Sequence, residues 1–269
     1  MAQTNITFVS VIIKNPEDQN ATIKRIDWLL KLIHAELPLV LYACPFFYSL
    51  FQGHLEVSYK GLKIVPLDIS GTEIFTHVRV AAEKRTIHLP QIRNTGKDTE
   101  FFCTLMNAKT ELVARAVRDG HVPTPFAAFI DASIAKVLHA PEATFTALKS
   151  TVVSNKITSI VIPGCRAPFE MGGELYSKES ILRQICWVFC GGFFIVPTGR
   201  AMEWHIRCRE LFVEFLLEGG YLTWEVNLWA YLGQITRGLI LWYSADHNDS
   251  MLRVPEYFQE AVAVPRANQ

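Results

Sequence analysis

Short apolar runs alternate with amphipathic segments in the first part of this chain, and this alternation restricts the possible folds more than any other feature. Residues 6–13 are rich in β-branched side chains and are typical of a buried strand. Residues 22–36 repeat apolar side chains at helical spacing, and residues 39–43 and 62–67 again resemble strands, with a short helix expected over 46–51. This β-α-β-α-β order predicts an α/β fold with a parallel sheet covered by helices on both faces.

The same pattern continues in the middle of the chain. Residues 98–118 form the most regular predicted helix, because acidic side chains open it, basic side chains close it and Gly120 suits its end. The fully apolar run Phe126–Ile130 then predicts a strand that ends at Asp131. Further elements are less regular: strands are expected over 157–162, 193–196 and 239–243, and helices over 200–218 and 223–234, the last capped by Thr223.

Composition narrows the class of partner. The 269 residues are half hydrophobic, which is enough for one large α/β domain. Lysine plus arginine balance aspartate plus glutamate at 26 each, and a nucleic-acid-binding protein usually has a basic excess. We therefore expect a small-molecule or saccharide partner and no nucleic acid.

The cysteines and the terminus indicate where such a protein works. The six cysteines form no Cys-x-x-Cys pair and mostly lie in apolar runs, so we expect buried, reduced thiols rather than a zinc site or disulfides. The first residues lack the pattern of a signal peptide. The longest apolar stretch, 185–197, contains Gly191–Gly192 and is shorter than the roughly 20 residues that span a bilayer. A soluble, cytoplasmic protein without a membrane span is expected.

Asp131 is the first candidate for chemistry. It stands at the carboxyl end of a predicted buried strand, the edge at which open α/β sheets bind ligands. A carboxylate there could bind Mg²⁺ or Mn²⁺, which favour oxygen ligands and share them with phosphates. It could equally cap the following segment by accepting hydrogen bonds from the backbone of Ser133 or Ile134. The residues alone leave both roles open.

Two further candidates lie late in the chain. His247, within the polar stretch 246–249 (DHND), could complete a metal shell, or the stretch could be an Asx-rich turn. Glu225 lies in the first turn of the predicted helix 223–234, where the helix N-terminus stabilises a carboxylate. That position suits a general base, although it also suits simple complementation of the helix dipole.

Three cationic or polar side chains could contact a phosphate. Asn107 and Lys109 interrupt the apolar stripe of the predicted helix 98–118 and could reach a phosphate or a ribose, or lie on its solvated face. Arg166, in a glycine-containing loop, could neutralise a diphosphate or be merely solvated. The glycine motifs of dinucleotide-binding proteins and P-loop enzymes, the nucleophile elbow of α/β-hydrolases and the zinc-protease motif are all absent.

Five stretches together resemble a known family. They are residues 97–100 (KDTE), 105–111 (LMNAKTE), 129–134 (FIDASI), 189–194 (FCGGFF) and 222–225 (LTWE). In these stretches the chain resembles the HtrL/YibB-like glycosyltransferases and, more broadly, the GT-A superfamily of nucleotide-sugar glycosyltransferases. The resemblance covers roughly residues 85 to 250, and the third of the chain before it agrees only in its order of strands and helices.

The resemblance implies a fold and a metal site. GT-A enzymes have a Rossmann-like, mostly parallel central sheet flanked by helices, with a smaller acceptor-side subregion. By this resemblance residues 1–138 would be the nucleotide-sugar-binding half, 139–260 the acceptor-side and catalytic half, and 261–269 a flexible tail of a single domain. The Asp-x-Asp motif that binds Mn²⁺ or Mg²⁺ and the diphosphate would correspond to Asp131, Ala132 and Ser133. His247 falls where a late histidine joins the metal shell, and Ser133 replaces the second acidic residue, which leaves the metal requirement open.

The resemblance also implies an activity. The chain would move a sugar from a nucleotide-diphospho donor, UDP-linked by expectation, to a hydroxyl of a saccharide acceptor with inversion. Glu225 would be the base, Gly191, Gly192 and Trp224 would line the acceptor side, and Asn107, Lys109 and Arg166 would contact the donor. Because Ser133 stands in place of an acidic residue, a second function stays open: a nucleotide-sugar or glycan-binding module that does not catalyse. A metal-dependent phosphodiesterase is disfavoured, because such sites cluster more acidic and histidine ligands.

Overall fold

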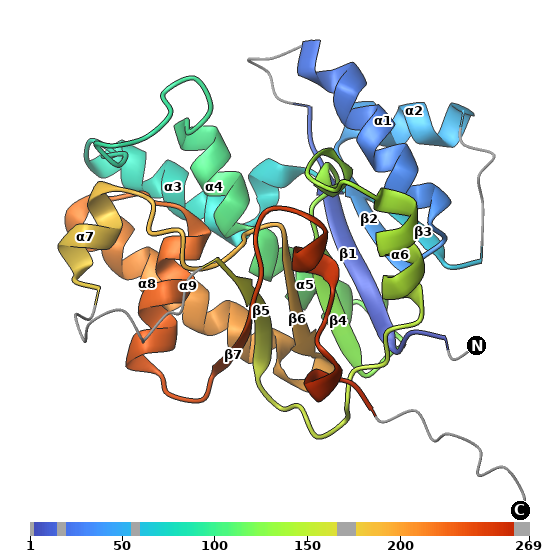
Figure 1. Cartoon of the computed structure of the whole chain (residues 1–269). Coiled ribbons are helices and arrows are strands. Elements are labelled where there is room, and N and C mark those ends of the chain that lie inside the picture. The colour runs from blue at the N-terminus through green and yellow to red at the C-terminus, as the bar shows by residue number, and fades with distance from the viewer. Residues whose placement is uncertain (1–2, 15–19, 55–59, 166–175, 261–269) are drawn as a thin grey trace, which may run out of the picture.

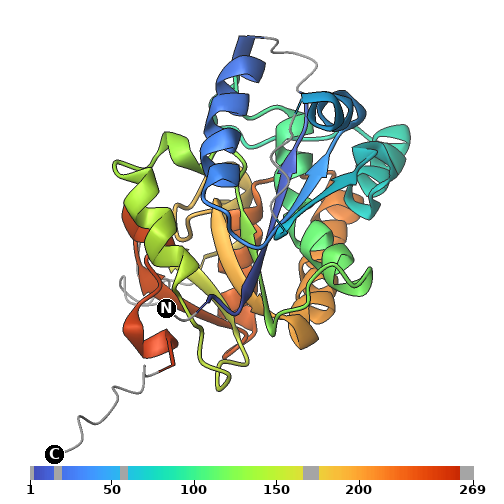
Figure 2. The same ribbon diagram turned by 90° about the vertical axis from the view of Figure 1, so that its right-hand side faces the viewer.

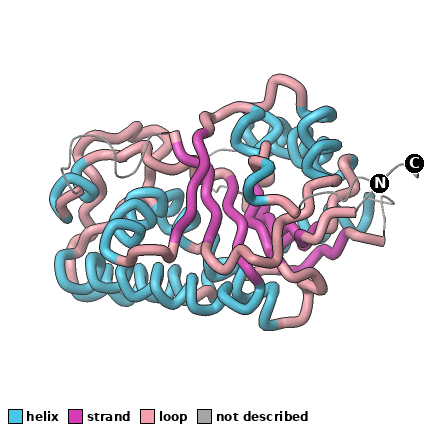
Figure 3. Tube along the Cα trace, turned by 60° about the horizontal axis from the view of Figure 1, so that its bottom comes forward, coloured by secondary structure: helices cyan, strands magenta, loops and turns pink. Residues whose placement is uncertain are grey.

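The computed structural model describes residues 3–14, 20–54, 60–165 and 176–260 (Figure 1). Within them a seven-stranded sheet runs through the middle, and helices lie on both sides of it (Figure 3). The strand order is β3-β2-β1-β4-β6-β5-β7, so the chain has an α/β, Rossmann-like architecture. The strands are β1 (Ile6–Ile12), β2 (Leu39–Ala43), β3 (Leu62–Pro66), β4 (Phe126–Ile130), β5 (Ile160–Gly164), β6 (Phe193–Pro197) and β7 (Ile240–Ser244).

The predicted parallel sheet is confirmed, with one strand reversed. β1 is parallel to both β2 and β4, in a register that places Val9 opposite Val40 and Phe129. β5 and β7 are also parallel. β6, however, is antiparallel to β4, so that Phe193 at its start pairs with Ile130 at the end of β4. The residues just before β6 are thereby placed at the edge of the sheet where β4 ends.

Helices cover the two faces of the sheet. α1 and α6 contact each other on one face, and α5 and α8 contact each other on the opposite face (Figure 2). None of the helices in the described part of the chain has the length and apolar character needed to cross a bilayer. The helices are α1 (Asn20–His34), α2 (Pro45–His54), α3 (Glu73–Lys84), α4 (Glu100–Asn107), α5 (Lys109–Arg118), α6 (Pro141–Lys149), α7 (Lys178–Arg183), α8 (Ala201–Gly219) and α9 (Glu225–Ile235).

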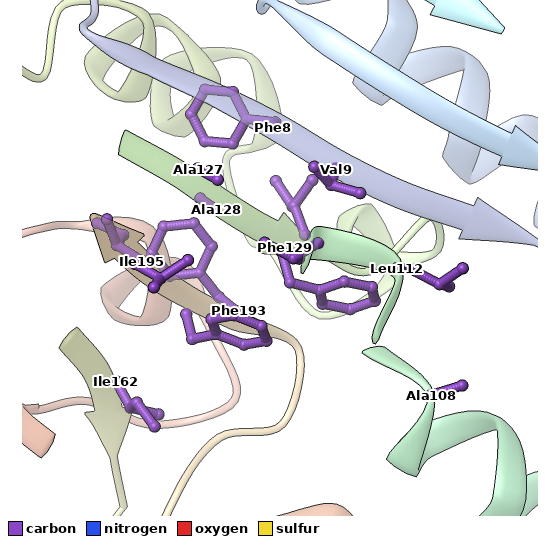
Figure 4. Packing of buried hydrophobic residues seen from close by; sticks show 14 of the residues in the cluster. Phe8, Val9, Ala108, Leu112, Ala127, Ala128, Phe129, Ile162, Phe193 and Ile195 are labelled. Carbon is purple, nitrogen blue, oxygen red and sulfur yellow. The ribbon is translucent and has the colours of Figure 1, made fainter. Parts of the chain in front are cut away.

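The core lies between the central strands and α5. Every residue of β4 is buried, as expected for a strand with helices on both faces. Phe129 of β4 and Phe194 of β6 stack with their ring centroids 5.9 Å apart. Leu112 of α5 is also fully buried and lies beside this part of the sheet (Figure 4). This packing fixes α5 against β4, and with it the first residue of α5, Lys109.

The single helix predicted over residues 98–118 is wrong, because two helices occupy that stretch. α4 begins after Thr99, whose hydroxyl accepts a hydrogen bond from the Phe102 amide. The helical structure is interrupted at Ala108, and α5 begins at the next residue. The break falls between Asn107 and Lys109, the two polar residues that interrupt the apolar stripe. Both side chains are buried and bond to other parts of the chain, so the interruption lies between two residues that are held by tertiary contacts.

Other boundaries also differ from expectation. Thr223 does not cap the helix that follows: α9 begins at Glu225, and the Thr223 hydroxyl donates to the carbonyl of Ile181 instead. The sequence pattern predicts none of α3, α6 and α7 as helices. α3 contains several β-branched residues and α6 two threonines, which weaken the helical pattern, and each buries few side chains on the rest of the structure.

Candidate functional site

The strand order reverses between β1 and β4. From β1 the chain builds outward through β2 and β3, and it then crosses to β4 on the other side of β1. In open α/β sheets the crevice at such a switch point, outside the carboxyl ends of the strands, is where ligands bind. Lys14 lies just beyond β1, Cys44 directly follows β2 and Asp131 directly follows β4. Asp131 therefore stands at the position that the sheet topology marks as a ligand site.

Asp131 forms the capping turn through one of its two carboxylate oxygens. Its Oδ1 accepts hydrogen bonds from the Ser133 amide at 2.8 Å and the Ser133 hydroxyl at 2.6 Å. Its backbone amide donates to the carbonyl of Gly192 at 2.9 Å, which ties the end of β4 to the start of β6. Among the described residues no donor bonds to Oδ2. Ala132, between the two polar residues, is buried and presents no polar side chain.

The charge around Asp131 is favourable to an anionic carboxylate. Burial alone would raise the pKa of Asp131, but the charges of Lys109 and Lys136 and the hydrogen bonds from Ser133 outweigh it and hold this pKa below its ordinary value. Lys136 is exposed in the short helical turn Ile134–Lys136 that follows. The site thus combines an ionised carboxylate with a solvent-facing cation, a combination that suits a phosphate-bearing ligand.

Lys109 and Glu225 form a buried ion pair behind this edge. The Lys109 Nζ donates to Glu225 Oε1 at 2.5 Å and to the Gly191 carbonyl at 2.8 Å. The two side chains are only 3% and 5% exposed. The same Nζ lies 5.3 Å from the ring centroid of Phe129. Two predicted site residues are therefore brought together, but they bind each other rather than facing the solvent.

The two predicted acceptor-side glycines have a packing reason to be glycine. A Cβ on Gly191 would lie 2.4 Å from Glu225 Oε1, and a Cβ on Gly192 would lie 2.9 Å from the Cδ1 of Ile134. Real Cβ atoms do not approach other atoms so closely, so a side chain at either position would displace its neighbours. The turn before β6 is consequently held close to both Asp131 and the ion pair.

Two other predicted residues, Asn107 and Trp224, do not face the site. Asn107 is buried, and its Nδ2 donates to the carbonyls of Cys103 and Thr223, each at 2.8 Å, so it supports the start of α9. Trp224 is also buried, which leaves its ring face covered. Arg166 lies outside the described residues.

His247 lies in the loop after β7 and contacts a different set of residues from Asp131. Its Nδ1 is 3.6 Å from the Sγ of Cys165 and 3.6 Å from a carboxylate oxygen of Asp246, and its ring packs edge-on against Trp187. Hydrogen bonding to Cys165 raises the pKa of His247, with burial opposing and Asp246 adding to the rise. β7 lies three strand positions from β4, roughly 14 Å at the usual strand spacing.

The other residues of the stretch 246–249 form a turn and accept hydrogen bonds from neighbouring segments. Asp249 is buried and accepts hydrogen bonds from the amides of His139 and Ala140 and the hydroxyl of Thr144, so it caps the start of α6. Asn248 accepts hydrogen bonds from the amide and hydroxyl of Ser250. The Asx-rich turn considered for this stretch is therefore present, with His247 projecting from it.

Sequence reasoning missed two residues at the switch point. The Nζ of Lys14 lies 4.6 Å from the ring centroid of Phe46, which stands near the start of α2, just beyond the end of β2. Phe46 is 46% exposed, unusual for a phenylalanine beside a sheet edge. Their positions in the sequence could have indicated them, because Lys14 and Phe46 each follow an apolar predicted strand within a few residues. An exposed aromatic ring and a cation here could contact a base and a phosphate.

Comparison with known proteins adds little at the level of residues. No family model and no curated protein matches the sequence. Among solved structures, the apo form of mouse xyloside xylosyltransferase 1 aligns with 88% of this chain and 84% of its own, at 11% identity and a TM-score of 0.43. So remote a likeness carries no information about the site.

Proposed function

We propose that this protein transfers a sugar from a nucleotide-diphospho donor, first of all a UDP-sugar, to a hydroxyl of a saccharide acceptor. The observation that carries the proposal is the ionised Asp131 at the switch point, whose Oδ2 accepts no hydrogen bond from the described residues and whose charge is balanced in part by Lys136. The stretches that resemble glycosyltransferases also support it, because four of them meet around this residue. FIDASI supplies Asp131, LMNAKTE supplies Lys109, FCGGFF supplies Gly191 and LTWE supplies Glu225.

The donor would lie across the carboxyl ends of β1, β2 and β4. In this arrangement Phe46 and Lys14 contact the nucleoside end, and Lys136 neutralises part of the diphosphate charge. Oδ2 of Asp131, which accepts no hydrogen bond from the described residues, would be the protein ligand of Mn²⁺ or Mg²⁺, ions that share oxygen ligands with phosphates and water. Such an ion would stabilise the charge that develops on the departing diphosphate. Ser133 would orient Asp131 through its two hydrogen bonds.

The acceptor would approach from the side of Gly191 and Gly192. Glu225 is the carboxylate nearest this turn, since a Cβ on Gly191 would touch it. For Glu225 to take a proton from an acceptor hydroxyl, its ion pair with Lys109 has to open and expose Oε1. We include this opening in the proposal, with inversion at the sugar as its stereochemical consequence.

The closed ion pair also favours a second candidate function. If Lys109 and Glu225 remain paired and buried when the site is filled, no carboxylate next to the turn is free to act as a base. The protein would then bind a nucleotide sugar or a glycan without turning it over. This candidate predicts the same donor site and differs only in catalysis.

Binding and turnover separate the two functions. We expect UDP and a panel of UDP-sugars, titrated calorimetrically with and without Mn²⁺, to bind the native protein and to bind Asp131→Ala at least tenfold more weakly. Asp119→Ala is the matched control, because Asp119 is a partly exposed aspartate that pairs with Arg118 on α5. Equal UDP affinity of native protein and Asp131→Ala would refute the donor site. Donor binding without hydrolysis or transfer to any saccharide would select the binding module.

A further inference from the structure

Two thiols and an imidazole converge at a place that the proposed donor site does not use. Cys165 directly follows β5, Cys190 lies shortly before β6, and His247 lies in the loop after β7. The two Sγ atoms are 3.2 Å apart, and the His247 Nδ1 is 3.6 Å from the Sγ of Cys165. All three ligand atoms lie within 4.8 Å of one another, which no other three such side chains achieve in the described part of the chain.

We propose that Cys165, Cys190 and His247 bind one Zn²⁺ ion. Zinc prefers thiolate and imidazole ligands in tetrahedral geometry, and these three residues offer two thiolates and one imidazole. With the usual bond lengths, a zinc ion holds sulfur and nitrogen ligands about 3.5 Å apart and two sulfurs about 3.8 Å apart. The sulfur-to-nitrogen value agrees with the 3.6 Å between the Cys165 Sγ and the His247 Nδ1. The sulfurs need to part by roughly half an ångström, and binding releases the thiol protons to solvent.

The backbone argues for a metal rather than a disulfide between these thiols. Gly164 and Phe189 pair in an antiparallel bridge, so Cys165 and Cys190 are diagonal neighbours on the two segments. Diagonal neighbours in such a pair have Cα atoms about 7–8 Å apart. A disulfide is not formed over more than about 7 Å without backbone movement, whereas a zinc ion lengthens the link between the two sulfurs.

The fourth zinc position would face an open cleft. Its volume is about 620 Å³, and it is lined by Cys165, Trp187, Ser244, Ala245, Asp246, His247 and Ser250. Trp187 has a φ of 51°, a left-handed conformation that is costly for a bulky residue. That conformation accompanies the edge-on contact of its ring with His247, at 5.3 Å between centroids. Water or an anionic ligand atom from the cleft would complete the tetrahedron.

The ion would join three segments that are distant in sequence. Cys190 is followed by Gly191, whose carbonyl accepts the hydrogen bond from Lys109. Zinc at the cluster would thus anchor the turn that lies against Asp131 while remaining outside the donor site. The zinc site does not depend on the proposed glycosyl transfer.

Metal titration of the reduced, chelator-treated protein tests the proposal. We expect one equivalent of Zn²⁺ to bind the native chain, and Co²⁺ to give thiolate-to-cobalt charge-transfer absorption. Cys165→Ala and Cys190→Ala should each lose tight binding, and His247→Ala should weaken it at least tenfold. Cys208→Ala is the matched control, because Cys208 is a buried cysteine of α8 outside the cluster. His247 is 38% exposed, so its substitution is the least able to disturb the fold.

Two results would overturn the zinc site. The first is a native, reduced protein that takes up no zinc, whether or not it forms the disulfide in air. The second is one equivalent of zinc still bound by the Cys165→Ala, Cys190→Ala double variant. UDP affinity, measured on the same variants, should fall far less than the tenfold expected for Asp131→Ala, because none of the three side chains belongs to the proposed donor site. A failure here therefore leaves the donor site standing, and a failure of Asp131→Ala leaves the zinc site standing.

Discussion

The Nζ of Lys109 lies 2.5 Å from the Oε1 of Glu225, and this pair joins the start of α5 to the start of α9 across 116 residues of sequence. Both side chains are withdrawn from water. A buried pair of this kind stabilises little in itself, because desolvation of the two charges offsets their attraction. Removing one partner, in contrast, leaves a buried charge uncompensated.

Lys109→Met should therefore destabilise the protein by about 3–5 kcal/mol, whereas Lys109→Met with Glu225→Leu should recover most of that loss. Urea denaturation of the two variants and the native chain measures the difference. The control is Lys149→Met, because Lys149 pairs with Glu36 on the surface and its loss should cost at most about 1 kcal/mol. A double variant as unstable as the single one would show that the pair contributes more than charge compensation.

Gly191→Ala tests the close approach of Glu225 to the turn before β6. The new Cβ would meet Glu225 Oε1 at 2.4 Å, so the carboxylate has to move and its bond to Lys109 has to lengthen. We expect a loss of about 1–3 kcal/mol in the free energy of unfolding, measured by denaturant titration. Gly199→Ala, where a Cβ meets nothing within 4 Å, should change it by a few tenths of a kcal/mol only. Equal stability of the two variants would contradict the packing argument.

Asp249 should make the stability of the folded protein depend on pH in the acidic range. Burial opposes ionisation, but hydrogen bonds from Thr144, Ala140 and His139 outweigh it and lower the pKa of Asp249 to about 2 from an ordinary 3.8. Because the folded pKa is the lower one, this stabilisation is present above about pH 4 and is lost as the pH falls through about 2. Asp249→Asn should lower the melting temperature at neutral pH, and the gap to the native chain should narrow in acid. A gap that stays constant from neutral pH down to about 2 would exclude this origin.

Phe46→Ala tests the nucleoside end of the donor site. Stacking of a base on an aromatic side chain contributes about 1–3 kcal/mol, so UDP should bind the variant at least about fivefold more weakly. Tyr257→Ala is the control, because Tyr257 is another exposed aromatic, at 69%, far along the chain from the switch point. Calorimetric titration of UDP decides the matter. Weakening of equal size in both variants would remove Phe46 from the site.

The local pattern of apolar residues was sufficient to predict most of the strands. β2 and β4 begin and end where their apolar runs do, because a strand buried on both faces excludes polar side chains along its whole length. The same reasoning failed at Ala108, where the predicted helix divides. Asn107 and Lys109 turn toward Thr223 and Glu225, and these partners lie more than a hundred residues away, beyond any periodicity.

The sequence by itself determined the α/β class, the position of Asp131 after a buried strand and the presence of glycines before β6. Only the tertiary structure decided the reversed direction of β6, which places Gly192 against Asp131. It also decided that Glu225 meets Lys109 and that His247 meets Cys165 rather than Asp131. The physical reason is that hydrophobic periodicity reports which face of an element is buried. The partner of a buried polar side chain depends instead on how distant elements pack.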